Sequence, residues 1–281
     1  MTKHGTARNR GLAAELKALR AKAELTTRQV AKRVGMSIAT VNRIENAQRE
    51  ITPEDVAALL AVYGVTGPER ARTLVLARNA NISGWRETDG EGLPLHLRAL
   101  TCFESEATRI TDVAMLRVPG LLQTAAYIRS ALIAVGFPED KRKEMATTRL
   151  RRQEVLRRRF PPNYRAVIDE AALRRPAGSR GLMAEQCRHL AQLTELPNVE
   201  IRVIPFEHGS HAGLDGSFMQ LESEKHNPII HVELPQSSMF LDAEHEIRPY
   251  RETSDNLWRV ALSSAESVKF LRRIGSEYGR E

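Results

Sequence analysis

The sequence of 281 residues has few cysteines and no long apolar run. Its two cysteines, Cys102 and Cys187, are too few for a disulfide framework and too isolated for a zinc knuckle. No run approaches eighteen uncharged apolar residues, and residues 1–10 are basic without the apolar stretch of a secretory signal. We therefore expect a reduced, cytoplasmic protein with no membrane span. Because 42% of the residues are hydrophobic and 27% are charged, wholesale disorder is excluded.

The positive charge lies at one end of the chain. Residues 1–80 carry 14 Lys or Arg and 7 Asp or Glu, whereas residues 81–281 carry 28 of each. A basic unit before a neutral body is typical of a nucleic-acid-binding head on a larger module, although an inert basic surface has the same composition. The neutral part contains its own basic stripe at residues 141–159, with nine basic and two acidic side chains.

Apolar periodicity divides the chain into two structural regions. Five short helices are expected over residues 9–80, with Thr26 or Thr27, Ser37 and Thr52 as caps. Helices are also expected over 94–160, with breaks at 119–120 and 136–138, and over 181–194 and 252–275, whereas strands are expected at 164–169, 199–204, 216–221, 229–234 and 239–242. The expected fold is an all-α helix-turn-helix bundle followed by an α+β domain with a small mixed or antiparallel sheet. The expected domains are 1–80 for DNA binding, 81–95 as a linker, and 96–281 for sensing, partner binding and dimerisation.

The segment 27–46 (TRQVAKRVGMSIATVNRIEN) has the spacing of a helix-turn-helix. Ala31 is small at the position where two helices cross, and Gly35 occupies the sharp turn, where a positive φ is tolerated. Val41 and Ile44 are expected to pack inward. The alternative interpretation is a helical hairpin within some other bundle, and the local surplus of positive charge argues against it.

This pattern resembles the xenobiotic-response-element family of regulators, which includes the phage Cro and CI repressors. The resemblance covers residues 10–80 and implies a recognition helix, at about 37–47, that enters the major groove of operator DNA. It implies phosphate contacts at both ends of the motif and at the helix cap, by Thr27, Arg28, Ser37, Asn46 and Arg49. It also implies that the outward face of the recognition helix is formed by Ile38, Ala39, Thr40, Asn42 and Arg43.

Asn42 can read adenine and Arg43 guanine, while Ile38 and Ala39 can contact a thymine methyl group. Many relatives have Gln or Arg where Ile38 and Ala39 stand, so specificity is expected to depend more on Arg43, Asn42 and DNA shape. Ile38 has the alternative role of packing against a partner or a neighbouring helix. A homodimer on two half-sites is expected, because repressors of this class generally bind in that way.

The second region contains three conspicuous stretches, at 118–124, 149–156 and 169–176. Together with later motifs at 203–206, 211–218 and 261–263, they resemble the uncharacterised C-terminal domain of actinobacterial WhiJ-like regulators, over about 92–275. The resemblance implies an antitoxin-like transcriptional regulator, often encoded beside a short partner protein. It implies no particular ligand or chemistry.

Two groups of residues in this region are candidates for binding a partner or a small-molecule effector. Gln123 and Thr124 can line a pocket, although local capping of a helix explains them more simply. Arg149, Arg152 and Arg157 belong to the basic stripe, whose simplest interpretation is a solvated helix face with Leu150, Val155 and Leu156 inward. Its functional alternatives are contact with an acidic partner or with DNA.

Enzyme chemistry and metal binding have little support in the sequence. Asp169 and Glu170 are adjacent carboxylates, which usually point apart, and they are expected to pair with Arg174 or with the arginines of 149–159. His208, His211 and Asp215 are too few for zinc, and His231 fits a buried strand position. We expect no cofactor, no metal and no catalytic residues.

The leading hypothesis is therefore a cytoplasmic, nucleoid-associated transcriptional regulator, of which repression is the expected mode. Its DNA binding would be controlled through the C-terminal domain by a small partner protein or a ligand. One alternative is an enzyme or a small-molecule-binding module tethered to a DNA-binding head. Another is an interaction protein whose helical head has lost DNA binding.

Overall fold

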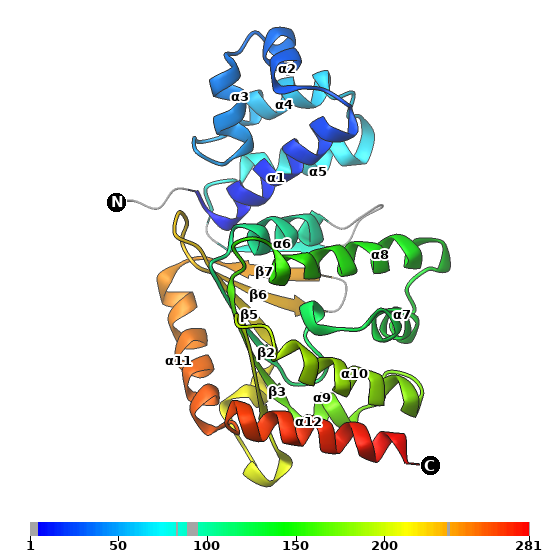
Figure 1. The fold of residues 1–281 in the computed structure, drawn as a ribbon. Helices are drawn as coiled ribbons and strands as arrows, with labels where there is room; N and C mark the ends of the chain where they lie inside the picture. The colour runs from blue at the N-terminus through cyan, green and yellow to red at the C-terminus, as the bar shows by residue number, and fades with distance from the viewer. Residues whose placement is uncertain (1–4, 83, 89–94, 235–236, 281) are drawn as a thin grey trace. The chain divides into compact units, whose positions relative to one another are not determined.

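The computed structural model describes residues 5–82, 84–88, 95–234 and 237–280, which divide into two compact units (Figure 1). Unit 1 contains residues 1–106 and 222–247, and unit 2 contains residues 107–221 and 248–281. The predicted fold class is confirmed, because a helical bundle is followed by an α+β region whose sheet has both parallel and antiparallel strand pairs.

Unit 1 begins with the five predicted helices, which are α1 (Ala7–Lys22), α2 (Thr27–Val34), α3 (Ile38–Glu45), α4 (Pro53–Val62) and α5 (Gly67–Arg78). Their boundaries follow from local chemistry. Thr26, Ser37 and Thr52 cap α2, α3 and α4, and each side chain accepts a hydrogen bond from a backbone N–H in the first turn. The shared core is formed by apolar side chains at helical spacing, including Leu12, Leu16, Val41, Ile44, Val56 and Leu59.

Unit 1 also contains α6 (Leu95–Glu106) and the strands β1 (Trp85–Thr88), β6 (Ile229–Leu234) and β7 (Ser237–Leu241). The strand order in this unit is β1-β7-β6, with Trp85 opposite Phe240 and Ile230 opposite Leu241. β1 therefore lies within the predicted linker, 81–95. Helix α1 packs along α6.

In unit 2 the strands have the order β5-β2-β3-β4, and β3 pairs in parallel with both β2 and β4. Their bounds are β2 (Arg109–Ala114), β3 (Asn163–Asp169), β4 (Val199–Ile204) and β5 (Phe218–Glu222). The prediction of helix over 94–160 was wrong for β2. Ile110, Thr111 and Val113 are β-branched, and the burial of Ile110 and Val113 in the sheet outweighs their weak helical pattern.

The helices of unit 2 cover both faces of these strands (Figure 1). The α-helices are α7 (Ala125–Ala134), α8 (Glu139–Arg152), α9 (Glu170–Arg174), α10 (Arg180–Leu193), α11 (Glu244–Val260, which begins in unit 1) and α12 (Ser264–Gly279). Short 3₁₀ turns are η1 (Gly120–Leu122), η2 (Gln153–Arg157), η3 (Phe206–His208) and η4 (Ala212–Asp215).

The predicted last helix, 252–275, is in fact two helices. Ser263 begins α12 with a capping box in which its hydroxyl accepts from the Glu266 N–H and the Glu266 side chain accepts from the Ser263 N–H. α12 then packs closely on α10 at Gly275, where an added Cβ would lie 3.3 Å from the Cβ of Cys187.

Candidate nucleic-acid interface

The turn between α2 and α3 has the predicted helix-turn-helix geometry. Gly35 adopts φ +78° at the end of α2 and donates its N–H to the carbonyl of Ala31 at 3.0 Å. Ala31 is 3% exposed. At the start of α2, Thr26 and Gln29 form a capping box, with the Thr26 N–H donating to the Gln29 side chain at 2.8 Å. Both ends of α2 are therefore defined, by the capping box at Thr26 and by the left-handed turn at Gly35.

α3 presents one buried face and one exposed face. Val41 and Ile44 are fully buried, whereas Ile38 is 41% exposed, and Ala39, Asn42 and Arg43 are also exposed. The hydroxyl of Ser37 accepts from the Thr40 N–H at 3.0 Å, which leaves other N–H groups of the first turn available to an anion. An exposed helix face with a free N-terminal end is suited to contact with base edges and phosphates.

The surrounding charge favours a polyanion. Arg28, Lys32, Arg33 and Arg43 are exposed, and the segment 27–46 has no exposed carboxylate, because its single acidic residue, Glu45, is buried. Arg28 lies on the first turn of α2, next to the half-buried Thr27.

Two of the predicted contact residues have partners within the bundle. The amide of Asn46 donates to the carbonyl of Asn42 at 2.7 Å, beyond the end of α3. The guanidinium of Arg49 lies 2.7 Å from a carboxylate oxygen of Asp55 on α4. Arg49 can therefore meet a phosphate only in competition with Asp55, a relationship that the spacing of the motif does not reveal.

A buried ion pair anchors the C-terminal end of α3. Arg20 on α1 donates to both carboxylate oxygens of Glu45, at 2.7 and 2.9 Å, and Tyr63 donates to the same carboxylate at 3.3 Å. The hydrogen bond to Glu45 raises the pKa of Arg20, while burial, reinforced by the Glu45 charge, raises the pKa of Tyr63. The network joins residues far apart in the sequence, so no local pattern indicates it.

α1 is also bound to α6 through buried charges. Arg98 of α6 lies 2.9 Å from Glu15, and Arg10 lies 2.7 Å from Glu106. Arg10 also stacks on Phe103 with its guanidinium carbon 4.6 Å from the ring centre. Side chains of Arg10 and Glu15 are 6% and 3% exposed. These contacts hold the bundle on α6 within unit 1.

In unit 2, Gln123 and Thr124 are buried in a local capping network. Thr124 caps α7 by accepting from the Tyr127 N–H at 3.2 Å, and its own N–H donates to Gln186 at 2.7 Å. The amide of Gln123 donates to the carbonyl of Val118 at 2.7 Å. Thr124 therefore has the capping role, Gln123 is held by a local hydrogen bond to the backbone, and neither residue lies on an open surface.

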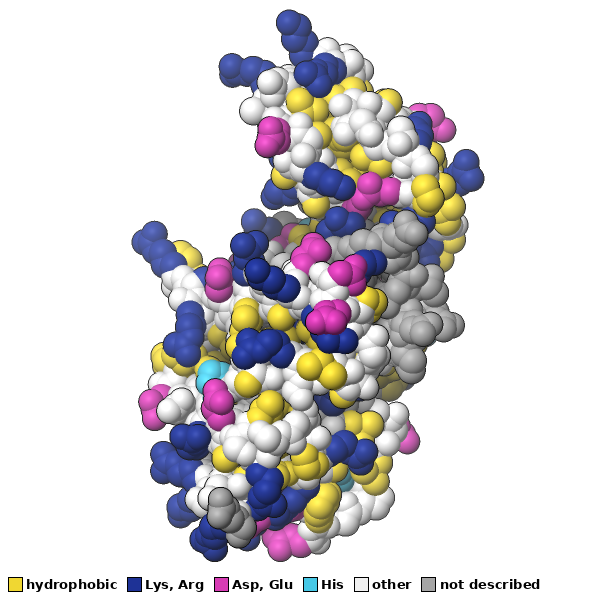
Figure 2. All heavy atoms as spheres, turned by 90° about the vertical axis from the view of Figure 1, so that its right-hand side faces the viewer, with side chains coloured by type: hydrophobic (Ala, Val, Ile, Leu, Met, Phe, Trp, Pro, Cys, Tyr) yellow, Lys and Arg dark blue, Asp and Glu magenta, His cyan; other side chains and the backbone are white. Residues whose placement is uncertain are grey.

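The basic stripe lies mainly on α8 and η2. Helix α8 is on the right-hand side of Figure 1, and this side faces the viewer in Figure 2. Arg149 and Arg152 are half-buried and have interactions within the chain, whereas Arg157 is exposed. Val155 and Leu156 are buried as predicted. The prediction for Leu150 was wrong, because it is 37% exposed. Met145 and Ala146 form the buried face of α8, and Leu150, four residues after Ala146 but five after Met145, lies at the edge of that face.

The adjacent carboxylates of β3 and α9 do point apart. Glu170 pairs with Arg174 at 2.9 Å, as predicted, but Asp169 accepts from the buried ring of His211 at 3.0 Å. Since the Gly213 N–H donates to Nδ1 of His211, the proton of the neutral ring lies on Nε2, toward Asp169. Among the described residues, no group of three His, Cys, Asp or Glu is placed to hold a metal.

His231 and Cys187 are both buried side chains. His231 is buried and lies 3.2 Å from the hydroxyl of Ser238, which agrees with a core histidine. Cys187 is buried, and burial raises the pKa of its thiol to about 12, so a thiolate does not form near neutral pH.

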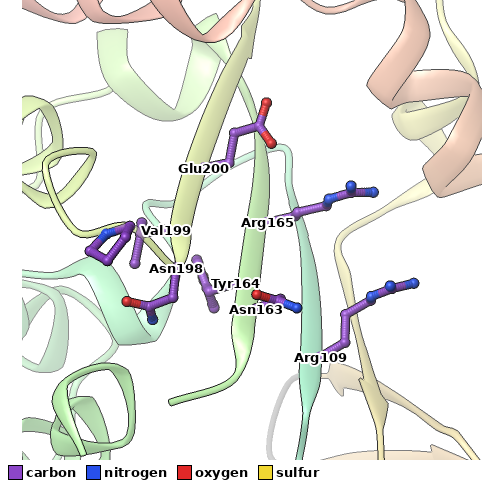
Figure 3. Close-up of a pocket in the computed structure, with 8 residues that line it drawn as sticks. Arg109, Asn163, Tyr164, Arg165, Asn198, Val199 and Glu200 are labelled. Carbon is purple, nitrogen blue, oxygen red and sulfur yellow. The ribbon is translucent and has the colours of Figure 1, made fainter. Parts of the chain in front are cut away.

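A pocket of about 260 Å³ lies at the amino ends of β2, β3 and β4. Figure 3 shows Arg109 and Arg165 extending to one side of the strands, whereas Tyr164 and Asn198 lie on the other side. Arg165 also stacks on Trp258 of α11 at 4.9 Å. Because the polar groups diverge, this pocket has no set of side chains converging on one ligand atom, which catalysis requires.

Comparisons with known proteins find two family matches in the chain. Residues 97–273 match the family described as a domain of unknown function (DUF5753), and residues 12–73 match a helix-turn-helix domain. No curated protein and no solved structure matches the sequence. In the described part of the chain, no helix has the length and apolar character needed to cross a membrane.

Proposed function

We propose, since the chain belongs to the family defined by the domain of unknown function DUF5753 and carries a helix-turn-helix domain, that it is a sequence-specific transcriptional regulator. In this proposal residues 1–80 bind operator DNA and residues 96–281 respond to a signal. The finer kinship, to xenobiotic-response-element regulators and to WhiJ-like regulators, is part of the proposal. A regulator of this kind works in the cytoplasm, at the nucleoid.

One observation carries the proposal, which is the exposed, cation-flanked face of α3. Ile38, Ala39, Asn42 and Arg43 point away from a core that Val41 and Ile44 fill. The length of α3, its capped N-terminus and the absence of an exposed carboxylate on 27–46 fit an insertion into the major groove. Arg43 is the residue best suited to donate two hydrogen bonds to a guanine.

The test is a quantitative DNA-binding titration with the full chain on its own promoter fragments. Arg43→Ala should weaken operator binding by ~1–3 kcal/mol and relax the preference at one base position. Arg78→Ala is the matched control, because it removes an exposed positive charge from α5 of the same bundle. Wild-type protein without preference for any promoter fragment at low salt would refute the proposal.

We further propose that the protein is an antitoxin-like repressor that binds DNA as a homodimer and is released by a small partner protein. The two half-sites would lie about one helical turn apart. A partner that binds the DNA-free form more tightly lowers the affinity for operator DNA, and operator DNA must lower the affinity for the partner by the same factor. Equal partner affinity with and without operator would contradict this mechanism. A small-molecule effector is the other signal compatible with it.

A further inference from the structure

We propose that α8 and the segment after it form a docking surface for an acidic amphipathic helix of a partner protein. The surface, called the α8 surface below, consists of the exposed side chains of residues 141–160. The inference rests on the proposed function, because it gives the partner of the regulator a binding site and a chemistry.

The first argument is the unbalanced charge of this surface. Residues 141–159 carry nine basic and two acidic side chains. Lys143, Arg151 and Arg157 are exposed, and in the part of the chain that the structure describes none of them has a carboxylate within 4 Å. The exposed Glu144 and Glu154 offset only part of this positive charge, and clustered like charges repel one another. An anionic partner would relieve this repulsion.

The second argument is the apolar content of the same surface. Leu150 is 37% exposed and Phe160 is 75% exposed. Helical spacing places Lys143, Thr147, Leu150 and Arg151 along one stripe of α8, so that a leucine lies among the polar side chains. Phosphates offer nothing to Leu150 or Phe160, but the apolar side of an amphipathic helix does. Figure 2 shows Lys and Arg side chains with hydrophobic ones between them over this side of unit 2.

The occupant of the α8 surface is a different protein and not a second copy of this chain. A second copy of this chain would need an acidic helix to match the net charge of +7 on residues 141–159. Among the described helices the most acidic is α4, which carries Glu54 and Asp55 and no basic residue, a net charge of only −2. One of its two carboxylates, Asp55, is already paired with Arg49. Charge complementarity therefore favours a separate acidic partner.

The fourth argument concerns which cations are available. Arg149 and Arg152 are half-buried and interact within the chain, and Gln153 fixes the end of α8 by donating to the carbonyls of Gly120 and Gln123 at 3.2 and 2.7 Å. This leaves a rigid base from which Lys143, Arg151 and Arg157 project. A preorganised surface loses less conformational entropy when a partner binds.

The experiment measures fluorescence anisotropy of a labelled peptide of about 20 residues, with Leu and Glu at helical spacing, titrated with the full chain. A peptide of the same composition in scrambled order is the control for simple charge attraction. Arg151→Glu combined with Arg157→Glu should weaken binding of the ordered peptide at least about tenfold. Leu150→Gln should weaken it several-fold without any change of charge. Lys269→Glu, on the exposed face of α12, should leave it unchanged.

Equal binding of the ordered and scrambled peptides, or no effect of Leu150→Gln, would overturn the proposal. So would a double variant that loses affinity for a random DNA duplex while it keeps the peptide, because the surface would then be a nucleic-acid contact. Circular dichroism melting confirms that each variant folds. The outcome is separable from the proposed function, since operator preference is measured on the same proteins and peptide binding can persist where operator preference is absent.

Discussion

Arg20 and Glu45 form a two-point ion pair that joins the first helix of the bundle to the last turn of the candidate recognition helix. The two residues are 25 positions apart in sequence, and the Glu45 side chain is only 3% exposed. Since Tyr63 also donates to Glu45, three helical segments of the bundle meet at one carboxylate. The orientation of α3 is therefore fixed by a polar contact as well as by apolar packing.

Glu45→Gln should destabilise the bundle by about 3 kcal/mol, because it leaves Arg20 as a poorly compensated charge. This loss of stability is at the low end of the range for breaking a buried ion pair, because the Arg20 side chain is still 17% exposed. Arg49→Gln is the control and should cost under ~1 kcal/mol, because its pair with Asp55 is more exposed. Urea unfolding followed by circular dichroism measures both, and equal losses would contradict the buried-pair interpretation.

Gly35→Ala should destabilise the protein by roughly 1–2 kcal/mol, because φ +78° is unfavourable for a residue with a Cβ. Sterics are not the cause, since an added Cβ at Gly35 would have no atom within 4 Å. Gly35→Asn should cost less. Gly181→Ala gives the opposite control, because Gly181 lies in α10 with equal free space, and alanine should add roughly 0.5–1 kcal/mol of stability there. Thermal unfolding that lowers Tm for both alanine variants would contradict the backbone argument.

Alkaline stability should depend on Cys187. Burial raises the pKa of its thiol to about 12, whereas an unfolded thiol titrates near pH 8.5. Above about pH 8.5 the unfolded chain therefore releases a proton that the folded chain keeps, so the free energy of unfolding falls as the pH rises toward 12. In Cys187→Ala this component is absent. Urea titrations at pH 7 to 10 should show that the difference in the free energy of unfolding between the two proteins changes only above about pH 8.5. A difference that stays constant over this range would disprove the raised pKa of Cys187.

Arg28→Ala should weaken DNA binding to operator and random sequences alike and reduce the salt slope by about one ion, as expected for a phosphate contact. Arg28 is exposed on the first turn of α2, ahead of the recognition helix. Titrations at several salt concentrations separate this pattern from the base-specific loss expected for Arg43→Ala. A loss confined to one operator position would place Arg28 at a base edge instead.

The bundle was predictable because its determinants are local. Ser37 begins α3, Gly35 ends α2, and Thr52 with Pro53 begins α4, each through chemistry that involves only a few neighbouring residues. The outward face of α3 follows from the burial of Val41 and Ile44 in the same way. The candidate contact residues are exposed or half-exposed as predicted, and their roles on DNA stay predictions.

The parts that escaped prediction depend on distant partners. β1 pairs with Phe240 and Met239, more than 150 positions away, and β2 exists because β3 lies beside it. The hydrogen bond between Asp169 and His211 likewise joins residues 42 positions apart. Leu150 was misplaced because apolar character alone does not separate the centre of a buried helix face from its edge, where Leu150 lies relative to Met145 and Ala146.

The buried charges between α1 and α6 have a practical consequence for anyone who divides this molecule. A fragment that stops at residue 80 would carry Arg10 and Glu15 without Glu106 and Arg98, and it would lose the aromatic ring on which Arg10 rests. In such a fragment Arg10 and Glu15 would lose their ion-pair partners beside newly exposed apolar surface, an arrangement prone to self-association. Reporter fusions and crystallisation fragments should keep α6, through residue 106, and the segment 222–247 of the same unit.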